Sequence, residues 1–359
     1  MKIPPFFLVL LLGFLAACHD NPSKSHAITY FEDDFVVPQD TCEVEELNSD
    51  FPFVYPIQSQ CVDSLIVVLD LMAPDYYFNL FDQTGRHIGR FGRKGKGPGE
   101  LLNPSQFFVP HPGVVSVYNT DRIVEYDLHD LEHLTTSFRE IHLPALPTVS
   151  QAVPYQPNRY LLLSFEAQKR IGIYDAVSDS IVFTYDRFPR LFETVSQNNE
   201  LESAIFSYGS RLYIKPDLTQ FAQTTYIGAI LEIFDLTADS VVSSSVTGIY
   251  SPQYVELSAN PLHITWGDKT IIGFESVATT DRYLYTLLNG CLGSELKKEN
   301  PEQPFTTRIS VFDWQGNPIR QLQTDRMLTT IARDDAADCF FATSYQNGLY
   351  SLLRIKEKK

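Results

Sequence analysis

A stretch of glycines and cations, Gly89 to Glu100, has residue types that could bind a ligand. Its glycines allow backbone amides to converge on an anion, and Arg93, Lys94 and Lys96 would add positive charge. Lys96 is followed by Gly97, not by a Ser or Thr that opens a helix, so the stretch is not a phosphate-binding P-loop. Two interpretations remain open. The three cations and Gly97 bind an anionic ligand or partner, or the glycines only shape a rigid connection between two elements.

Few groups of residues in the sequence have the types and spacing needed for catalysis or for metal binding. His129 and His133 have the i, i+4 spacing of a zinc helix, but they fall in a predicted hairpin turn. Asp334, Asp335 and Asp338 could offer carboxylates to Ca²⁺, yet the segment lacks the Gly and the distal Glu of a calcium loop. From these motifs we predict no catalytic residue, no metal ligand and no cofactor.

The elements that position these residues follow from one repeated pattern, in which an alternating apolar stretch ends in an aromatic residue and Asp. The aspartates are Asp82, Asp127, Asp175, Asp235 and Asp313. Asp can hydrogen-bond the backbone two residues on, so each copy predicts a strand that ends in a turn, and thus a β-hairpin. The spacings are 45, 48, 60 and 78 residues. The first two match a four-stranded propeller blade of roughly 40 to 50 residues.

The repeats predict an all-β fold, a six-bladed β-propeller. After Asp313, residues 328–355 form a partial sixth copy, with strands expected at 331–334, 340–343 and 349–353. A β-sandwich is the competing fold, but it gives no reason for one hairpin signature to recur at blade spacing.

Closure of the ring requires one more strand, because an open ring would leave exposed strand edges. We expect an N-terminal strand, at 27–31 or at 35–37, to close the last blade. The longer spacings further along the chain predict insertions, at 216–225 in the fourth blade and at 289–304 in the fifth.

The N-terminal residues have the pattern of a lipoprotein export signal. A basic start precedes an apolar stretch, Phe6 to Leu15, that is too short to span a bilayer, and Leu15-Ala16-Ala17-Cys18 resembles the bacterial lipobox. Acylation of Cys18 would anchor the mature chain on a membrane, whereas an ordinary signal with an incidental Cys18 would not. The expected organisation is a signal peptide at 1–17, a lipidated tether at 18–26 and the propeller at 27–359.

Net charge limits the classes of binding partner, and cysteine content limits the possible metal sites and disulfides. The formal net charge of −16 argues against nucleic acid and against attraction to an anionic bilayer surface. Beyond Cys18, the chain has Cys42, Cys61, Cys291 and Cys339, whose spacing fits no metal site. Disulfides in an exported chain, with three possible pairings, and buried thiols remain equally open.

A family resemblance rests on the loop, the lipobox and the repeats together. Gly95-Lys96-Gly97-Pro98-Gly99-Glu100 after the first hairpin resembles the TolB-like six-bladed β-propeller lipoproteins of Gram-negative bacteria. The resemblance covers most of the mature chain. It implies the fold and a cell-envelope address, with the outer membrane as the expected site, facing the periplasm or the surface. It transfers no catalytic residue.

The expected function is a lipid-anchored, non-catalytic module that binds an envelope protein, a small ligand or a glycan where loops of the ring face converge. The alternative is a metal-dependent hydrolase of the six-bladed lactonase kind, with Glu, Asn and Asp side chains holding a divalent metal such as Ca²⁺ in the central channel. Three or more acidic or amide side chains on the axis would favour the hydrolase. An apolar or aromatic axis would favour the binder.

Overall fold

The computed structural model describes most of the chain beyond the N-terminal segment. The described residues are 29–30, 40–48, 51–143, 149–164, 170–189, 209–249, 257–260, 263–296 and 305–358. The predicted signal, Cys18 and the strand candidate at 35–37 lie outside these ranges. Within them, no helix has the length and apolar character that crossing a membrane would require.

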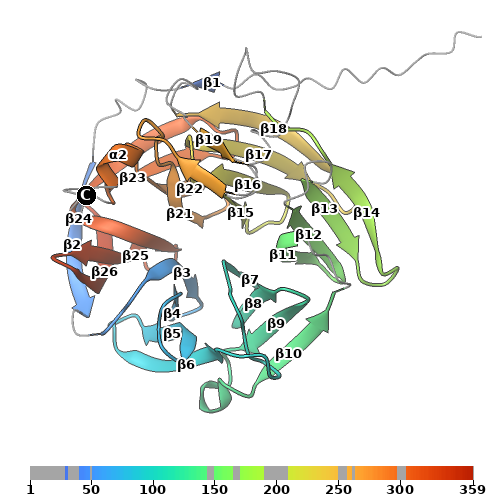
Figure 1. Ribbon diagram of the computed structural model, residues 1–359. Coiled ribbons are helices and arrows are strands. Elements are labelled where there is room, and N and C mark those ends of the chain that lie inside the picture. Colours follow the sequence, from blue (N-terminus) through green and yellow to red (C-terminus); the bar gives the residue numbers. More distant parts are fainter. Residues whose placement is uncertain are drawn as a thin grey trace, which may run out of the picture.

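Antiparallel sheets stand around a central axis, each with its first strand innermost (Figure 1). The first three are regular four-stranded blades, and their strands follow chain order. Blade one has β3 (Pro56–Val62), β4 (Leu65–Asp70), β5 (Tyr76–Asp82) and β6 (His87–Arg93). Blade two has β7 (Phe107–His111), β8 (Val114–Asn119), β9 (Arg122–Asp127) and β10 (Phe138–His142). Blade three has β11 (Val149–Gln156), β12 (Arg159–Ser164), β13 (Ile171–Asp175) and β14 (Ser180–Tyr185).

The remaining strands complete the ring. Blade four has β15 (Ser210–Ile214), β16 (Gln220–Thr225), β17 (Ile230–Leu236) and β18 (Val241–Gly248). The last sheet has seven strands, among them β21 (Phe274–Thr279), β22 (Tyr283–Leu288), β23 (Thr306–Asp313), β24 (Pro318–Asp334), β25 (Cys339–Gln346) and β26 (Leu349–Glu357). The first part of β24 pairs with β23 as the outer strand of blade five, and its second part pairs with β25 as the inner strand of blade six. The described strands thus form six blades, as predicted.

The seventh strand of that sheet comes from the N-terminal part of the chain. It is β2 (Asp40–Asn48), which runs antiparallel to the C-terminal strand β26. The predicted candidate at 27–31 lies elsewhere, because β1 (Thr29–Tyr30) pairs in parallel with β18 of blade four. An outermost strand has one face in solvent, so β2 can be acidic where an inner strand cannot. Its carboxylates face arginines of blades five and six, in the pairs Asp40–Arg320, Glu45–Arg354 and Glu46–Arg326.

The aromatic-Asp repeat has the predicted structural role. It ends the third strand of each of the first five blades and opens the hairpin to the fourth strand. The aromatic residues are at most 2% exposed: Phe81, Tyr126, Tyr174, Phe234 and Phe312. In blade one, the backbone N–H of Thr84 donates to Asp82 Oδ1 at 2.9 Å, the predicted bond to the residue two positions on. Large rings therefore fill the space between blades while each Asp fixes its turn.

Of the two predicted insertions, the one at 216–225 is absent and the one at 289–304 is present. Residues 220–225 form β16, and the turn before it is short, with the Thr219 N–H donating to Asp217 Oδ1 at 3.0 Å. The insertion expected at 216–225 is therefore wrong, and the extra length of this repeat lies between β14 and β15. The one at 289–304 contains α2 (Gly293–Leu296). A separate hairpin, β19 (Leu257–Asn260) and β20 (His263–Trp266), precedes blade five.

Candidate functional site

The inner strands begin around a cavity of about 720 Å³ on the central axis. All inner strands start at the same end of the ring, so residues far apart in sequence meet there. Each blade contributes to the wall: Ile57, Ser105, Gln151, Arg211, Glu275 and Thr329. Connections between second and third strands add Thr120 and Tyr226, and the start of β26 adds Tyr350. The cavity therefore opens at the loop face on which the sequence predicted binding.

Aromatic and hydroxyl side chains dominate the cavity wall. The aromatic residues are Tyr55, Tyr118, Tyr226, Phe274, Phe305 and Tyr350. Tyr55 is 44% exposed, while Tyr118 is buried and donates its hydroxyl proton to the carbonyl of Thr120 at 2.6 Å. Since tyrosine combines a flat apolar ring with a polar tip, such a wall suits an amphipathic ligand.

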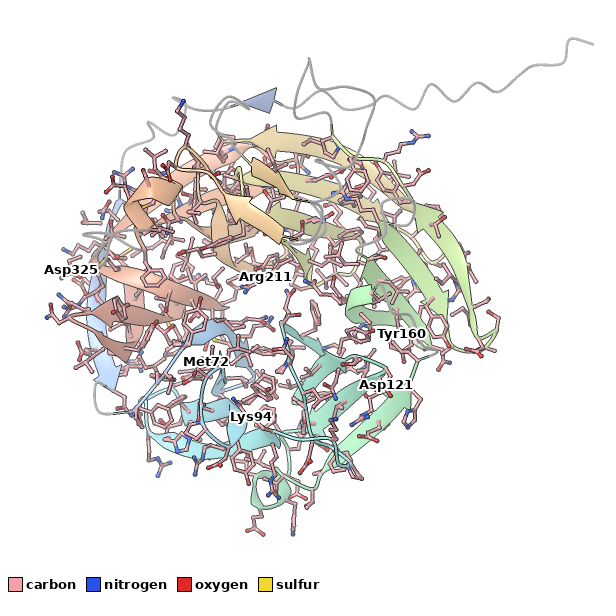
Figure 2. All side chains as sticks on the ribbon, in the orientation of Figure 1. Met72, Lys94, Asp121, Tyr160, Arg211 and Asp325 are labelled. Carbon is pink, nitrogen blue, oxygen red and sulfur yellow. The ribbon has the colours of Figure 1, made fainter. Side chains whose placement is uncertain are left out.

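Arg211 holds three blades together at the axis. It lies at the centre of the ring in Figure 2. Its Nη1 donates to the carbonyl of Glu275 in blade five at 2.9 Å and to that of Ile57 in blade one at 3.2 Å. A fixed guanidinium of this kind contributes positive charge to the cavity while its orientation is set by the backbone.

Glu275 places a carboxyl group in the same wall. Its Oε1 accepts a hydrogen bond from Asn289 Nδ2 at 2.9 Å, and its Oε2 is buried with no hydrogen-bond partner among the described residues. Burial raises the pKa of Glu275 to about 8, although the Asn289 hydrogen bond and the charge of Arg211 lower it. Glu275 therefore holds its proton to a higher pH than an ordinary carboxyl group, and one of its oxygens has no partner among the described residues.

The shifted pKa of Glu275 predicts a pH dependence of stability. The folded state binds this proton more tightly than the unfolded state, where the pKa is ordinary, so the associated stability is fully present below pH 4.5. It is lost as the pH rises through about 8. In Glu275→Gln nothing titrates, so its melting temperature should rise relative to wild type as the pH goes from 5 to 9. The exposed Glu132→Gln is the matched control, and a constant difference for Glu275→Gln across the series would contradict this prediction.

Two inner-strand glutamines join neighbouring blades through their amides. Gln58 Nε2 donates to the carbonyl of Phe107 at 2.8 Å and its Oε1 accepts from the same residue's N–H at 2.9 Å. Gln151 likewise donates to the carbonyl of Ser210 and accepts from the N–H of Leu212, both at 3.1 Å. These amides are engaged with backbone and are not open to a metal or ligand.

The wall holds three acidic or amide side chains and six aromatic ones, so it meets both criteria in number, and the hydrogen bonds of the amides decide between them. The acidic and amide residues of the wall are Asn103, Gln151 and Glu275. The Gln151 amide is hydrogen-bonded to the backbone of blade four. Glu275 is the one carboxylate among the described wall residues. Across the part of the chain that the structure describes, no three His, Cys, Asp or Glu side chains gather as a metal site would require. No local sequence pattern marks Arg211 or Glu275, so the sequence missed both.

The predicted anion-binding residues lie apart from the cavity wall, in the connection from blade one to blade two. Gly97 N–H donates to Glu100 Oε2 at 2.8 Å, and a Cβ on Gly95 would clash with that oxygen. The anion in this glycine cradle is thus the chain's own Glu100. Lys94 Nζ donates to the carbonyl of Leu71 at 3.1 Å. Arg93 and Lys96 are exposed, and Arg93 Nε lies 3.7 Å from Glu100 Oε1, so an external anionic partner for the two cations stays a prediction.

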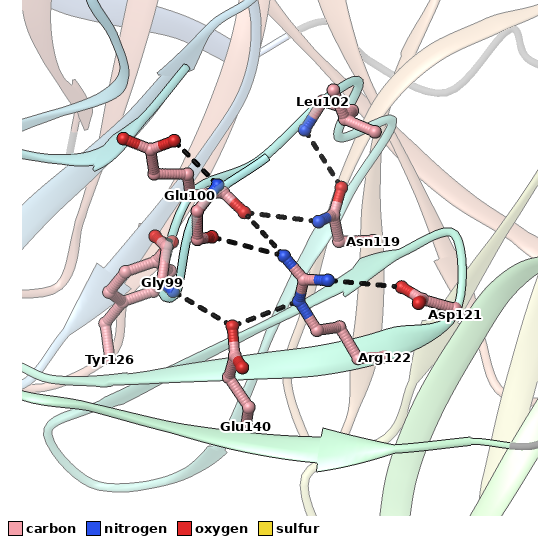
Figure 3. A network of polar contacts seen from close by, with 9 residues as sticks. Gly99, Glu100, Leu102, Asn119, Asp121, Arg122, Tyr126 and Glu140 are labelled. Atoms are coloured by element: carbon pink, nitrogen blue, oxygen red, sulfur yellow. Dashed lines mark hydrogen bonds and ion pairs between the residues drawn. The ribbon is translucent and has the colours of Figure 1, made fainter. Parts of the chain in front are cut away.

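A polar network fixes the same connection onto blade two (Figure 3). Glu140 Oε1 accepts from the Gly99 N–H at 2.9 Å and lies 3.0 Å from Arg122 Nε. Asn119 Nδ2 donates to the Glu100 carbonyl at 3.2 Å, and the Tyr126 hydroxyl donates to the Gly99 carbonyl at 2.7 Å. These contacts match the structural interpretation, a rigid crossing between two blades.

Gly99→Val should destabilise the protein by about 2–3 kcal/mol. Gly99 has φ +67°, and a Cβ there would approach the Phe138 ring to 2.5 Å. Gly97 does not have a positive φ, and its Cβ would lie 3.0 Å from the flexible Glu100 side chain. Gly97→Ala is therefore the milder control. Urea unfolding measures both, and equal losses would show that backbone conformation does not set the cost.

The four described cysteines are free thiols. Cys61 and Cys339 pack in one hydrophobic cluster between blades one and six, and Cys42, a residue of β2, packs in another. Burial raises the pKa of Cys42 to about 11 and also raises those of Cys61, Cys291 and Cys339. Of the two interpretations left open by the sequence, the structure has the free thiols, with Cys42 and Cys339 buried and Cys61 and Cys291 half-buried.

The fold and the cavity define an all-β propeller with six blades and an aromatic central pocket. The chain belongs to the TolB-like 6-blade propeller-like family, whose model matches residues 34–336. Among solved structures it is similar to a Bacteroides fragilis protein described as exported, with 13% identity and a TM-score of 0.55 over 93% of this chain and 98% of that one. It is also similar to an auxiliary nutrient binding protein of Bacteroides thetaiotaomicron, with 10% identity and a TM-score of 0.51 over 89% and 78%. No curated protein matches the sequence.

Proposed function

We propose that this protein is a non-catalytic binding module of the cell envelope that takes its ligand at the mouth of the central cavity. The observation that carries the proposal is the cavity wall, which combines six aromatic side chains with one guanidinium and one carboxyl group. Its volume of about 720 Å³ falls within the roughly 300–1,000 Å³ of small-molecule sites. Such sites are mostly apolar and contain a few fixed polar groups, of which Arg211 is an example here.

Exposed apolar residues beside the cavity support binding at this face. Val54 and Tyr55 precede β3, Met72 follows β4, and Leu102 precedes β7. They are between 44% and 61% exposed and lie at the same ends of their strands as the cavity wall. A ligand that extends from the cavity would cover them, which is a reason for their exposure.

The envelope location rests on the export signal and on a fold shared with exported and nutrient-binding proteins. We propose that Cys18 is acylated and tethers the propeller to the outer membrane. Cys18→Ser should then release the protein from the membrane fraction or leave the signal uncleaved. Fractionation with intact-mass measurement tests this, and normal mass with unchanged membrane retention would exclude a lipid anchor.

The lactonase-like alternative lacks a specific observation in its favour, because the described wall residues offer a single carboxylate. Binding at the cavity can be tested by thermal shift with a panel of amino acids, nucleotides, sugars and short peptides. We expect at least one class to raise the melting temperature of wild type by several degrees.

Tyr55→Ala should abolish that shift, because Tyr55 lines the mouth and its exposure limits the effect on folding. Tyr283→Ala is the matched control, since Tyr283 starts β22 at the opposite end of blade five. A shift that survives in Tyr55→Ala, or no shift with any class, would reject binding in this cavity.

A further inference from the structure

We infer that the ligand of the cavity is a neutral, polyhydroxylated molecule of the glycan class, with Glu275 as its hydrogen-bonding anchor. The inference rests on the proposed function and narrows it to one ligand chemistry.

The charge of the wall excludes strong selection for an ion of either sign. Arg211 and Glu275 are its ionisable cation and carboxyl group among the described residues, and the Arg211 guanidinium already donates to two backbone carbonyls. An anionic ligand would meet a single cation whose hydrogen bonds are already in use. A cationic ligand would be repelled by the positive charge of Arg211. A neutral ligand avoids both costs.

Hydroxyl groups are the commonest polar groups of the wall. Ten of its 22 residues are Ser, Thr or Tyr. A hydroxyl both donates and accepts. The hydroxyls of Tyr118, Ser150 and Thr329 are bonded within the protein, and the others of this set complement a ligand that itself carries many hydroxyls. Tyr55, Tyr226 and Tyr350 also offer ring surfaces on which the apolar face of a sugar ring can pack.

Glu275 supplies a carboxyl oxygen without a partner among the described residues, and the Ser210 hydroxyl is the other such atom of the wall. Asn289 holds its Oε1, while Oε2 is buried without a partner among the described residues. Because that oxygen is buried, a ligand hydroxyl reaches it once the Glu275 side chain turns toward the cavity, and the hydroxyl can then bond it whether the acid is protonated or ionised. Burial raises the pKa of Glu275, so the protonated acid can donate to a ligand oxygen at neutral pH. The groups that interact with it are Arg211, Tyr226, Tyr350 and Cys291.

The test measures binding of the full chain to three sets of immobilised oligosaccharides. They are neutral gluco-, manno-, xylo- and galacto-oligosaccharides, cationic chitosan oligomers and anionic oligogalacturonates. Wild type should bind one or more of the neutral set. Glu275→Gln, which stays neutral and can donate, should keep that affinity within about threefold, whereas Glu275→Ala should lose about tenfold or more.

Several results would overturn the inference. One is binding confined to chitosan that is lost in Glu275→Gln, and another is binding confined to oligogalacturonates. A third is no binding to the neutral set. The last is binding to the neutral set that Glu275→Ala does not weaken. The melting temperatures of both variants show whether they fold. If Glu275→Ala does not, Glu275→Met, which keeps the side-chain volume but offers no comparable hydrogen bond, replaces it with the same expected loss. If another ligand class gives a thermal shift that Tyr55→Ala abolishes, cavity binding stands while the glycan assignment falls. If no ligand depends on Tyr55, the proposed function itself fails.

Discussion

Glu232→Ala should destabilise the fold by about 3–5 kcal/mol, because it leaves a buried guanidinium without its carboxylate. Arg170, just before β13, and Glu232 on β17 are 0% and 1% exposed, and Nη2 lies 2.5 Å from Glu232 Oε2. Gln223 Oε1 accepts a bond from the same Nη2 at 2.5 Å, and Arg170 Nη1 donates to the carbonyl of Arg187 at 2.8 Å. The ion pair therefore joins blades three and four inside the protein, where water cannot replace the lost partner.

A double variant separates the pair from its surroundings. Arg170→Met with Glu232→Leu removes both charges, so it should lose much less than Glu232→Ala alone. Ser243→Ala is a useful control, since the Ser243 hydroxyl donates to Glu232 Oε1 at 2.6 Å and its loss leaves the ion pair intact. Urea unfolding of the three proteins gives the comparison. If Glu232→Ala is no less stable than the double variant, other groups must compensate the buried charge of Arg170.

Deletion through Asn48 should lower the free energy of unfolding by an amount on the order of 5 kcal/mol, or cause aggregation. It removes β2, and with it the ladder to β26 that runs from the Cys42–Glu357 pair to the Asn48–Leu352 pair. It also removes the carboxylates of the Arg320, Arg326 and Arg354 ion pairs. The C-terminal strand would then present an unpaired edge.

A truncation that stops at Val37 is the matched control, because it removes the same N-terminal segment and keeps β2. Chemical unfolding and size-exclusion chromatography should show a protein close to wild type. Both truncations lack Cys18, so differences in lipid attachment do not enter the comparison. Equal stability of the two would show that β2 is not what closes the ring.

Local patterns predicted the blades, because each hairpin carries its own signal. The aromatic residue and Asp at Phe81-Asp82 and Phe312-Asp313 mark a buried strand end and a turn, whatever the rest of the chain does. The closing strand was missed because apolar runs were sought. In β2 the signal is instead an alternation, with Cys42 buried and Val44 half-buried between exposed acidic neighbours, as expected of a strand at a solvent-facing edge.

The candidate site could not be predicted in the same way. Arg211 and Glu275 meet only when blades four and five stand side by side, and no short spacing records that meeting. The glycine loop did carry a local signal, but its meaning depended on Glu100. That residue belongs to the same short stretch and fills the cradle that an external anion would need. An acidic residue beside converging amides is thus a reason to expect an internal ligand.

The 17-residue strand β24 has a consequence for how the ring opens. Because one continuous backbone belongs to both blades five and six, neither can separate from the other without breaking β24. These two blades should behave as one cooperative unit in native-state hydrogen exchange, with amides of β23 and β25 exchanging through a common opening. Blades six and one meet instead through side chains, such as Gln83 Nε2 and Asp334 Oδ2 at 2.7 Å. The chain itself continues from β2 of blade six into β3 of blade one, so the first reversible opening of the ring is expected within blade six, where β2 pairs with β26.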